Sequence, residues 1–199
     1  CGRRYIIEDD YDSEYRFSGK PIPSLQSLDT SGKVIYLGTF SRSIAPSIRI
    51  AYMILPPDLM SVYRTHFDYC APTVSRFEQH TLERFISGGH YTRNLNRTRT
   101  LYKRRRDGFL QLMKKHWNHK KYAIYGDNLG LHFLLLIKNG MSESELKKKS
   151  ADCGLILKAL SEYYIEGAPE YPVFLINYTG FHYEQAEEII RLLKDAWAL

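Results

Sequence analysis

Two apolar runs rich in β-branched residues enclose a short polar link in the stretch KVIYLGTFSRSIAPSIRIAYMIL, residues 33–55. A similar run, RYIIED, residues 4–9, precedes them and turns acidic at its end. Apolar residues follow one another in these runs without strict alternation, which predicts strands of a sheet covered on both faces. The link from Gly38 to Arg49 contains Pro46 and is barely long enough for a helical crossover. We therefore expect the strand at 49–55 to run antiparallel to the strand at 33–38.

Downstream of these strands, helical and extended patterns alternate. Residues 74–86 predict a helix with Val74, Phe77 and Phe85 on one face, and a long basic helix follows at 91–117. The last third predicts strands at 131–137, 155–157 and 173–176, and helices at 142–154 and 183–197. The order predicts an α/β chain whose first domain spans residues 1–115 and whose small C-terminal α/β domain spans residues 116–199.

Composition excludes several classes of protein. The chain has 199 residues, of which 44% are hydrophobic and 25% are charged, which is ordinary for a globular chain and unlike a disordered tail, a collagen or a disulfide scaffold. Its longest apolar run, Phe133 to Ile137, is too short to span a membrane. Three cysteines without metal-like spacing suit a reducing, cytoplasmic location. The N-terminus lacks a secretory signal, and we expect the chain to begin within a longer protein.

The net charge of +6 is concentrated in one segment. Residues 93–121 contain eleven lysines and arginines and a single acid, Asp107. Such a run could contact the phosphates of a nucleic acid or face a partner subunit. However, a partly apolar stripe at helical spacing runs through the same segment, which favours a solvated helix with one packed face. The stripe comprises Tyr91, Leu95, Thr98, Tyr102, Phe109, Leu112 and His116.

Polar side chains gather where the first three predicted strands end or begin. In open α/β sheets, ligands bind at such strand ends. A carboxylate, a phenol, hydroxyls and guanidiniums together suit a ligand with a phosphate, a phenolate-like oxygen and a basic ring nitrogen. The candidates are Asp9, Tyr11, Thr39, Ser41, Arg42 and Arg49.

Residues 5–17 and 36–52 closely resemble the MocR/GabR group of bacterial transcription regulators, and the similarity continues through 89–93, 102–106 and 130–132. In that family a GntR-type winged-helix DNA-binding domain is fused to a domain similar to fold-type-I, pyridoxal-phosphate-dependent aminotransferases. The resemblance implies that this chain is the second half of the large aminotransferase-like domain, with a mixed sheet and helices, followed by the small domain. It also implies a homodimer with the cofactor site near the subunit interface.

The resemblance assigns roles to individual residues. Asp9 matches the aspartate that pairs with the pyridine nitrogen of the cofactor, and Tyr11 matches the tyrosine that contacts its ring hydroxyl. Thr39 and Ser41 match the hydroxyl positions beside the phosphate, and Arg49 matches the phosphate-binding arginine.

Position 42 departs from the family pattern, which has there the lysine that forms a Schiff base with pyridoxal phosphate. Arg42 stays protonated and offers no free amine, so imine formation at this position is lost. We therefore expect no catalytic residue and no transamination, and pyridoxal phosphate, if bound, to be held without a covalent bond. No metal site is expected, because His116 and His119 have no acidic or cysteine partner in the sequence around them.

Three functions remain open from the sequence. The first is an effector domain that senses a vitamin B6 compound or an amino compound without turnover, in a regulator that contacts DNA only through a winged-helix domain outside this chain. The second is a fold-type-I aminotransferase with a lysine-to-arginine change at residue 42. The third is a scaffold that serves only for dimerisation.

Overall fold

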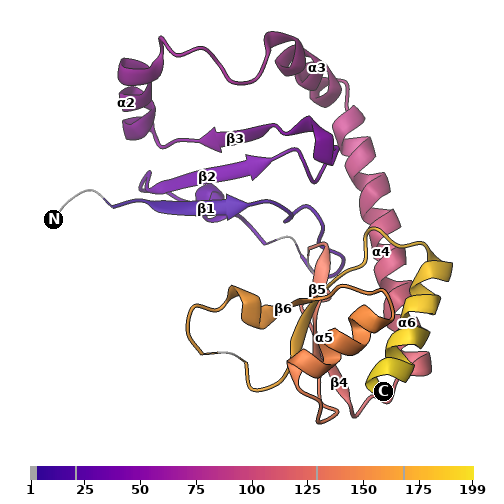
Figure 1. The fold of residues 1–199 in the computed structure, drawn as a ribbon. Helices are drawn as coiled ribbons and strands as arrows, with labels where there is room; N and C mark the ends of the chain where they lie inside the picture. The colour runs from indigo at the N-terminus through magenta and orange to yellow at the C-terminus, as the bar shows by residue number, and fades with distance from the viewer. Residues whose placement is uncertain (1–3, 21, 129, 168) are drawn as a thin grey trace. The chain divides into compact units, whose positions relative to one another are not determined.

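The computed structural model describes residues 4–20, 22–128, 130–167 and 169–199. Contacts divide the chain into two compact units (Figure 1). Unit 1 comprises Cys1–Glu14 and Gly19–Thr98, and unit 2 comprises Tyr15–Ser18 and Arg99–Leu199. This division falls inside the long helix α4 (His90–His116). The assignment of two domains to residues 1–115 and 116–199 stays a prediction.

Unit 1 is built on a three-stranded sheet with the order β1-β2-β3. Strand β1 runs parallel to β2, with Asp10 opposite Gly38, and β2 runs antiparallel to β3, with Thr39 opposite Ala51. The predicted antiparallel third strand is thus confirmed, because the short link after Gly38 allows only a reversal. The elements of unit 1 before α4 are β1 (Ile6–Asp10), α1 (Leu25–Leu28), β2 (Val34–Thr39), the 3₁₀ turn η1 (Pro46–Ile48), β3 (Ala51–Ile54), α2 (Pro57–Phe67) and α3 (Arg76–Ser87).

A close approach of side chain to backbone joins β2 and β3. Tyr52 lies opposite Gly38, and a Cβ atom placed on Gly38 would come within 2.4 Å of the Tyr52 Cζ atom. The Tyr52 ring also packs against Phe40, with ring centroids 5.1 Å apart, and against Tyr36, at 6.2 Å. Only glycine leaves room for this ring over the strand.

The prediction that the sheet of unit 1 is covered on both faces is wrong for the residues that the structure describes. Ile6 and Ile7 on β1 are 52% and 67% exposed, and Met53 on β3 is 49% exposed. The predicted inward face of α3 is also open, because Phe77 is 80% exposed. Apolar runs without alternation identified the strands correctly, but the described part of unit 1 does not supply the layers that would bury them.

Two helix starts in unit 1 differ from expectation. Pro56 and Pro57 end β3 as predicted, but Pro57 is also the first residue of α2, a helix that was not predicted from the sequence. Proline is favoured at the first position of a helix because the N–H that it lacks would be unpaired there. Helix α3 begins at Arg76 instead of Val74, because Ser75 and Glu78 form a reciprocal capping box.

Unit 2 folds around a four-stranded antiparallel sheet with the order β4-β5-β7-β6. Alternate residues of β5 are buried: Phe133, Leu135 and Ile137 are each at most 1% exposed. The elements are the second part of α4, β4 (Tyr122–Tyr125), β5 (His132–Ile137), α5 (Glu143–Asp152), β6 (Lys158–Ala159), the 3₁₀ turn η2 (Leu160–Tyr163), β7 (Val173–Asn177) and α6 (Tyr183–Trp197). The sequence missed β4, and it placed β6 too early, at 155–157.

Two tryptophans connect the helices of unit 2 through hydrogen bonds from their indole N–H groups. Trp117 at the end of α4 donates from Nε1 to the carbonyl of Ile190 on α6, at 2.9 Å. Trp197, fully buried at the end of α6, donates to the carbonyl of Leu146 on α5, at 3.1 Å. The predicted capping box of Ser142 with Glu145 opens α5. Within the described ranges, the structure contains no helix with the length and apolar character needed to cross a bilayer.

Candidate cofactor site

The candidate site lies in unit 1, at the edge of the sheet where β1 and β2 end. Because these strands are parallel, their carboxyl ends meet at the same edge, and Asp9 and Asp10 lie opposite Leu37 and Gly38. The Asp9 side chain is exposed there, and Thr39 is the last residue of β2. The sheet topology therefore brings the acid of β1 and the polar link after β2 to the same edge.

The charges of two predicted residues, Asp9 and Arg42, act on the phenol of a third, Tyr11. Partial burial raises the pKa of the Tyr11 phenol, and so do the charges of Asp12 and Asp9, whereas the positive charge of Arg42 lowers it. Charges act on a phenol in this way only at short range. We call Asp9, Tyr11 and Arg42 the candidate cluster, because both charges act on the Tyr11 phenol and the parallel strands before them end at the same edge of the sheet.

Thr39 and Ser41 hold the backbone of the link after β2. The Thr39 Oγ1 atom donates to the carbonyl of Ile50, at 3.2 Å, and accepts from the N–H of Ser41, at 3.1 Å. The Phe40 N–H donates to the same carbonyl of Ile50, at 3.0 Å, which closes the link at its base. A threonine hydroxyl has one proton to donate, so Thr39 shapes the link in this arrangement, and Ser41 is buried beneath it.

Arg49 has a backbone conformation that is unusual for its residue type. It follows η1 and lies in the left-handed region, with φ 49° and ψ 31°, and its side chain is exposed. A non-glycine residue in this region costs on the order of 1 kcal/mol, and such residues cluster at functional sites. The role of the Arg49 guanidinium at the entry to β3 stays a prediction.

Polar and aromatic side chains form hydrogen bonds with the acidic residues around the candidate cluster, and these bonds were not predicted from the sequence. Asp10 accepts a hydrogen bond from the Tyr36 hydroxyl, at 2.8 Å, and one from the Ser13 hydroxyl, at 2.7 Å. Glu14 accepts from the Tyr91 hydroxyl, at 3.4 Å, and burial raises the pKa of the Glu14 carboxyl. Two sequence features could have indicated these hydrogen bonds: the acidic segment after β1 and the high content of tyrosine, 16 residues.

The link after β2 is also tied to the first turns of α4. The Asn94 side-chain amide donates to the carbonyl of Ser43, at 3.1 Å. Phe40 packs edge-on against Tyr91, with ring centroids 6.0 Å apart. Residues 40–43 are therefore fixed from both β3 and α4.

The donor set fits the pyridoxal phosphate that the resemblance implies, except for the covalent bond. Asp9 provides an exposed carboxylate for a ring nitrogen, Tyr11 provides a phenol, and Arg49 provides an exposed guanidinium for a phosphate. Arginine supplies no nucleophilic amine at residue 42. The described ranges contain no cluster of histidine, cysteine and acid side chains that would hold a metal ion.

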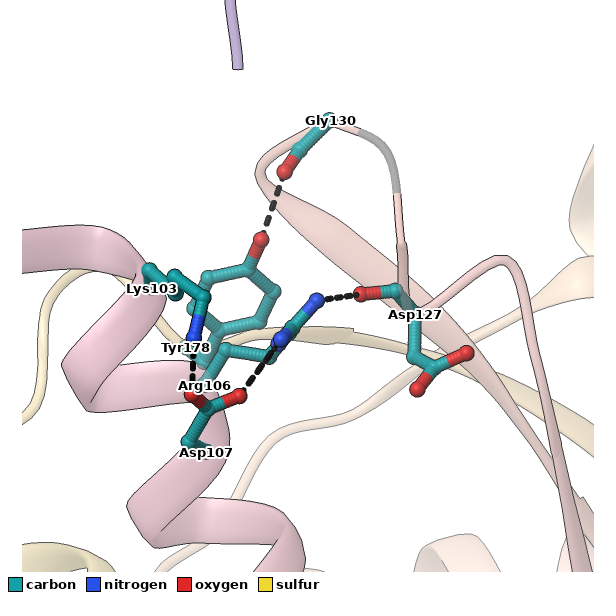
Figure 2. A network of polar contacts seen from close by, with 6 residues as sticks. All are labelled: Lys103, Arg106, Asp107, Asp127, Gly130 and Tyr178. Carbon is teal, nitrogen blue, oxygen red and sulfur yellow. Dashed lines mark hydrogen bonds and ion pairs between the residues drawn. The ribbon is translucent and has the colours of Figure 1, made fainter. Parts of the chain in front are cut away.

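The basic stretch of α4, the alternative site for nucleic acid, is largely paired within unit 2. Arg106 is buried, donates from Nη1 to the carbonyl of Asp127, at 2.9 Å, and from Nε to the Asp107 carboxylate, at 2.9 Å (Figure 2). Lys103 donates to the same carboxylate, at 2.9 Å. The expected stripe is confirmed in this part of the helix, where Phe109 and Leu112 are buried. Arg106 is also buried on this side of the helix, which the spacing of the apolar stripe does not predict.

Comparison with known proteins supports the regulator family. No family model matches the chain. It is 43% identical to the uncharacterized HTH-type transcriptional regulator YhdI of Bacillus subtilis over 98% of this chain and 41% of the relative. It is 32% identical to the probable rhizopine catabolism regulatory protein MocR of Rhizobium meliloti, over 97% of this chain and 39% of the relative. The HTH-type pyridoxine biosynthesis transcriptional regulator PdxR of Corynebacterium glutamicum is 33% identical over 80% of this chain and 34% of its own length.

Solved structures agree on the fold. The kynurenine aminotransferase of Pyrococcus horikoshii, in complex with PMP, superposes with a TM-score of 0.81 at 25% identity, over 98% of this chain and 48% of that one. The α-aminoadipate aminotransferase LysN of Thermus thermophilus gives a TM-score of 0.82 at 20% identity, over 98% and 50%. The chain spans about two fifths of the length of YhdI and of MocR. Over that span it is similar in sequence to the MocR-type HTH transcription regulators and has the α/β fold of the fold-type-I aminotransferases.

Proposed function

We propose that this chain is the ligand-sensing, aminotransferase-like part of a MocR-type regulator and holds a pyridoxal-phosphate-type compound without a covalent bond through residue 42. The observation that carries the proposal is the cluster of Asp9, Tyr11 and Arg42 at the strand ends, where the lysine expected from the family is replaced by arginine. Two relatives support the ligand class: one is named as a pyridoxine biosynthesis regulator, and a structural neighbour was solved with PMP.

Each residue has a defined task in this proposal. Asp9 accepts a hydrogen bond from the protonated ring nitrogen, and Tyr11 contacts the ring hydroxyl. Arg49 and the link of Thr39 and Ser41 hold the phosphate, because a guanidinium forms charge-assisted hydrogen bonds with phosphate oxygens. When bound, the cofactor supplies an aldehyde and an electron-withdrawing ring. Arg42 adds positive charge beside the phenol and holds its proton throughout.

The remaining parts of the proposal concern the whole protein. DNA is contacted through an HTH segment outside this chain, the protein acts as a homodimer in the cytoplasm, and the effector is a vitamin B6 compound or an amino compound. The relatives named as HTH-type regulators support the DNA partner.

The first test is borohydride trapping of full-length protein with pyridoxal phosphate, followed by peptide mass spectrometry. We expect the wild-type protein to remain unlabelled and Arg42→Lys to be labelled at residue 42. Specific labelling of a lysine in the wild-type protein would contradict the proposal and favour the alternative function, a pyridoxal-phosphate-dependent aminotransferase.

The second test separates binding from folding at Arg49. Arg49→Gly should bind pyridoxal phosphate about tenfold more weakly, because a charge-assisted bond to phosphate is lost. It should be at least as stable as wild type, because glycine adopts the left-handed conformation without penalty. Arg64→Gln, which removes an exposed arginine on α2, is the matched control and should leave binding unchanged. Equal affinity of Arg49→Gly and wild type would remove Arg49 from the site.

A further inference from the structure

Unit 2 contains a hollow between α4 and α6 that no predicted site residue lines. Its volume is about 290 Å³, and its walls come from the middle of α4, the turn after β7 and the first half of α6. These two helices lie side by side (Figure 1), consistent with the bond from Trp117 to Ile190. We call this hollow the α4–α6 pocket. All six residues predicted for the cofactor lie in unit 1, so the pocket is a separate feature.

The floor of the α4–α6 pocket is aromatic. Phe109 of α4 and Tyr178, after β7, are 4% and 1% exposed and both line the pocket. Phe181 completes this floor, with its ring centroid 6.4 Å from that of Phe109. The Tyr178 hydroxyl is fixed by a hydrogen bond to the carbonyl of Gly130, at 2.5 Å (Figure 2). A flat apolar group would find aromatic contacts here.

The rim of the pocket is cationic. Arg104, Arg105 and His182 line it, and none of the described lining residues is acidic. Arg105 is oriented by a hydrogen bond from Nη1 to the carbonyl of Thr179. Arg104 is exposed and has no hydrogen bond or ion pair with any residue in the described part of the chain. The adjacent cations, Lys103 and Arg106, are both paired with Asp107, which leaves Arg104 available for an anion (Figure 2).

One wall of the pocket depends on a glycine inside α4. A Cβ atom on Gly108 would lie 3.3 Å from the Tyr183 Cδ2 atom, so the Tyr183 ring packs directly against the helix backbone. Glycine is unfavourable in the interior of a helix. Its presence in α4 is explained by the room that it gives to Tyr183, which lines the pocket.

We propose that the α4–α6 pocket binds a small aromatic carboxylate. The Arg104 guanidinium receives the carboxylate, and the ring of the ligand lies against Phe109 and Phe181. A phosphodiester backbone fits less well, since the floor is apolar and Asp107 neutralises the neighbouring cations. The volume accommodates one ring with a short acidic side chain.

The test measures binding of three probes to full-length protein by isothermal titration calorimetry. Phenylacetate carries both the ring and the charge, phenylacetamide keeps the ring without the charge, and acetate keeps the charge without the ring. We expect saturable binding of phenylacetate and at least about tenfold weaker binding of the other two, because each lacks one of the two recognised groups. Arg104→Gln should weaken phenylacetate binding about tenfold.

Two controls locate the binding. Lys114→Gln removes an exposed cation on the same helix, outside the pocket, and should change nothing. Arg49→Gln should also leave phenylacetate binding intact, because Arg49 belongs to the cofactor site of unit 1. The proposal is overturned by equal binding of phenylacetamide, by an unaffected Arg104→Gln, by loss of binding in Arg49→Gln, or by no saturable binding up to about 10 mM.

Discussion

The two units of the chain are stabilised in different ways. Of the buried apolar side chains in the described residues, all but Val34, Ile50 and Pro56 lie in unit 2. Unit 2 has a continuous core between its sheet and three helices, whereas unit 1 is held by strand pairing, by the packing of Tyr52 and Phe40, and by hydrogen bonds around Asp10. The candidate cluster of Asp9, Tyr11 and Arg42 therefore lies in the unit with the smaller core.

The largest expected effect tests the core of unit 2. Trp197→Ala should lower the free energy of unfolding of unit 2 by about 3–5 kcal/mol, because a fully buried indole and its two hydrogen bonds are lost. Phe77→Ala in unit 1 should stay within about 0.5 kcal/mol, because Phe77 is exposed. Hydrogen exchange of the β5 amides measures the stability of unit 2, and exchange of the β2 amides measures that of unit 1. A comparable loss for both variants would show that Phe77 is covered and that the contrast does not hold.

A smaller effect is expected from Gly38→Ala in unit 1. The added methyl group meets the Tyr52 ring at 2.4 Å, so strand pairing or the ring must shift, at a cost of about 1–3 kcal/mol. Adding Tyr52→Ala to this background should cost less than Tyr52→Ala alone, because the clash disappears with the ring. Gly180→Ala, where nothing lies within 4 Å of the added methyl group, is the matched control. Additive effects in urea titrations of the double variant would contradict the predicted clash.

The smallest effect compares a single carboxylate in each unit. Hydrogen bonds from the backbone N–H of Val34, and also from those of Ser31 and Lys33, lower the pKa of Asp29 to about 2. Hydrogen bonds from Lys147 and Lys158 lower the pKa of Glu162 in unit 2 to about 2. A carboxylate whose pKa is lowered in the folded state stabilises that state at pH values above its ordinary pKa. This stabilisation is lost as the pH falls towards the pKa of the carboxylate in the folded state.

Asp29→Asn and Glu162→Gln should therefore be less stable than wild type at pH 6, and each difference should shrink between about pH 4.5 and pH 2. Hydrogen exchange in β2 reports on the first variant and exchange in β7 on the second. A difference that stays constant over this range would show that the carboxylates are not the groups that titrate.

Much of the fold could be predicted because the decisive signals are local. The β-branched runs located β1, β2 and β3, and the spacing of Ser142 and Glu145 located the start of α5. Other features depend on partners distant in the sequence. Strand β4 is short and is defined by its pairing with β5, and Arg106 is buried because the carbonyl of Asp127 lies beside it.

The candidate site could be predicted in composition more than in arrangement. The sheet topology brings Asp9 to the same edge as Tyr11 and Arg42, as the strand-end argument indicated. The sequence could not show that Thr39 donates its proton to Ile50, because that bond requires the return of β3 to β2. The left-handed backbone of Arg49 was also hidden, since it follows from the 3₁₀ turn before it and not from the residue type.

Helix α4 runs without interruption from unit 1 into unit 2. Its 27 residues make a rod about 40 Å long. Near the start of the helix Asn94 donates to the carbonyl of Ser43, and in its second half Arg106 donates to the carbonyl of Asp127. The helix therefore receives tertiary contacts from residues of both units, which explains how a segment so rich in polar residues stays helical over its full length.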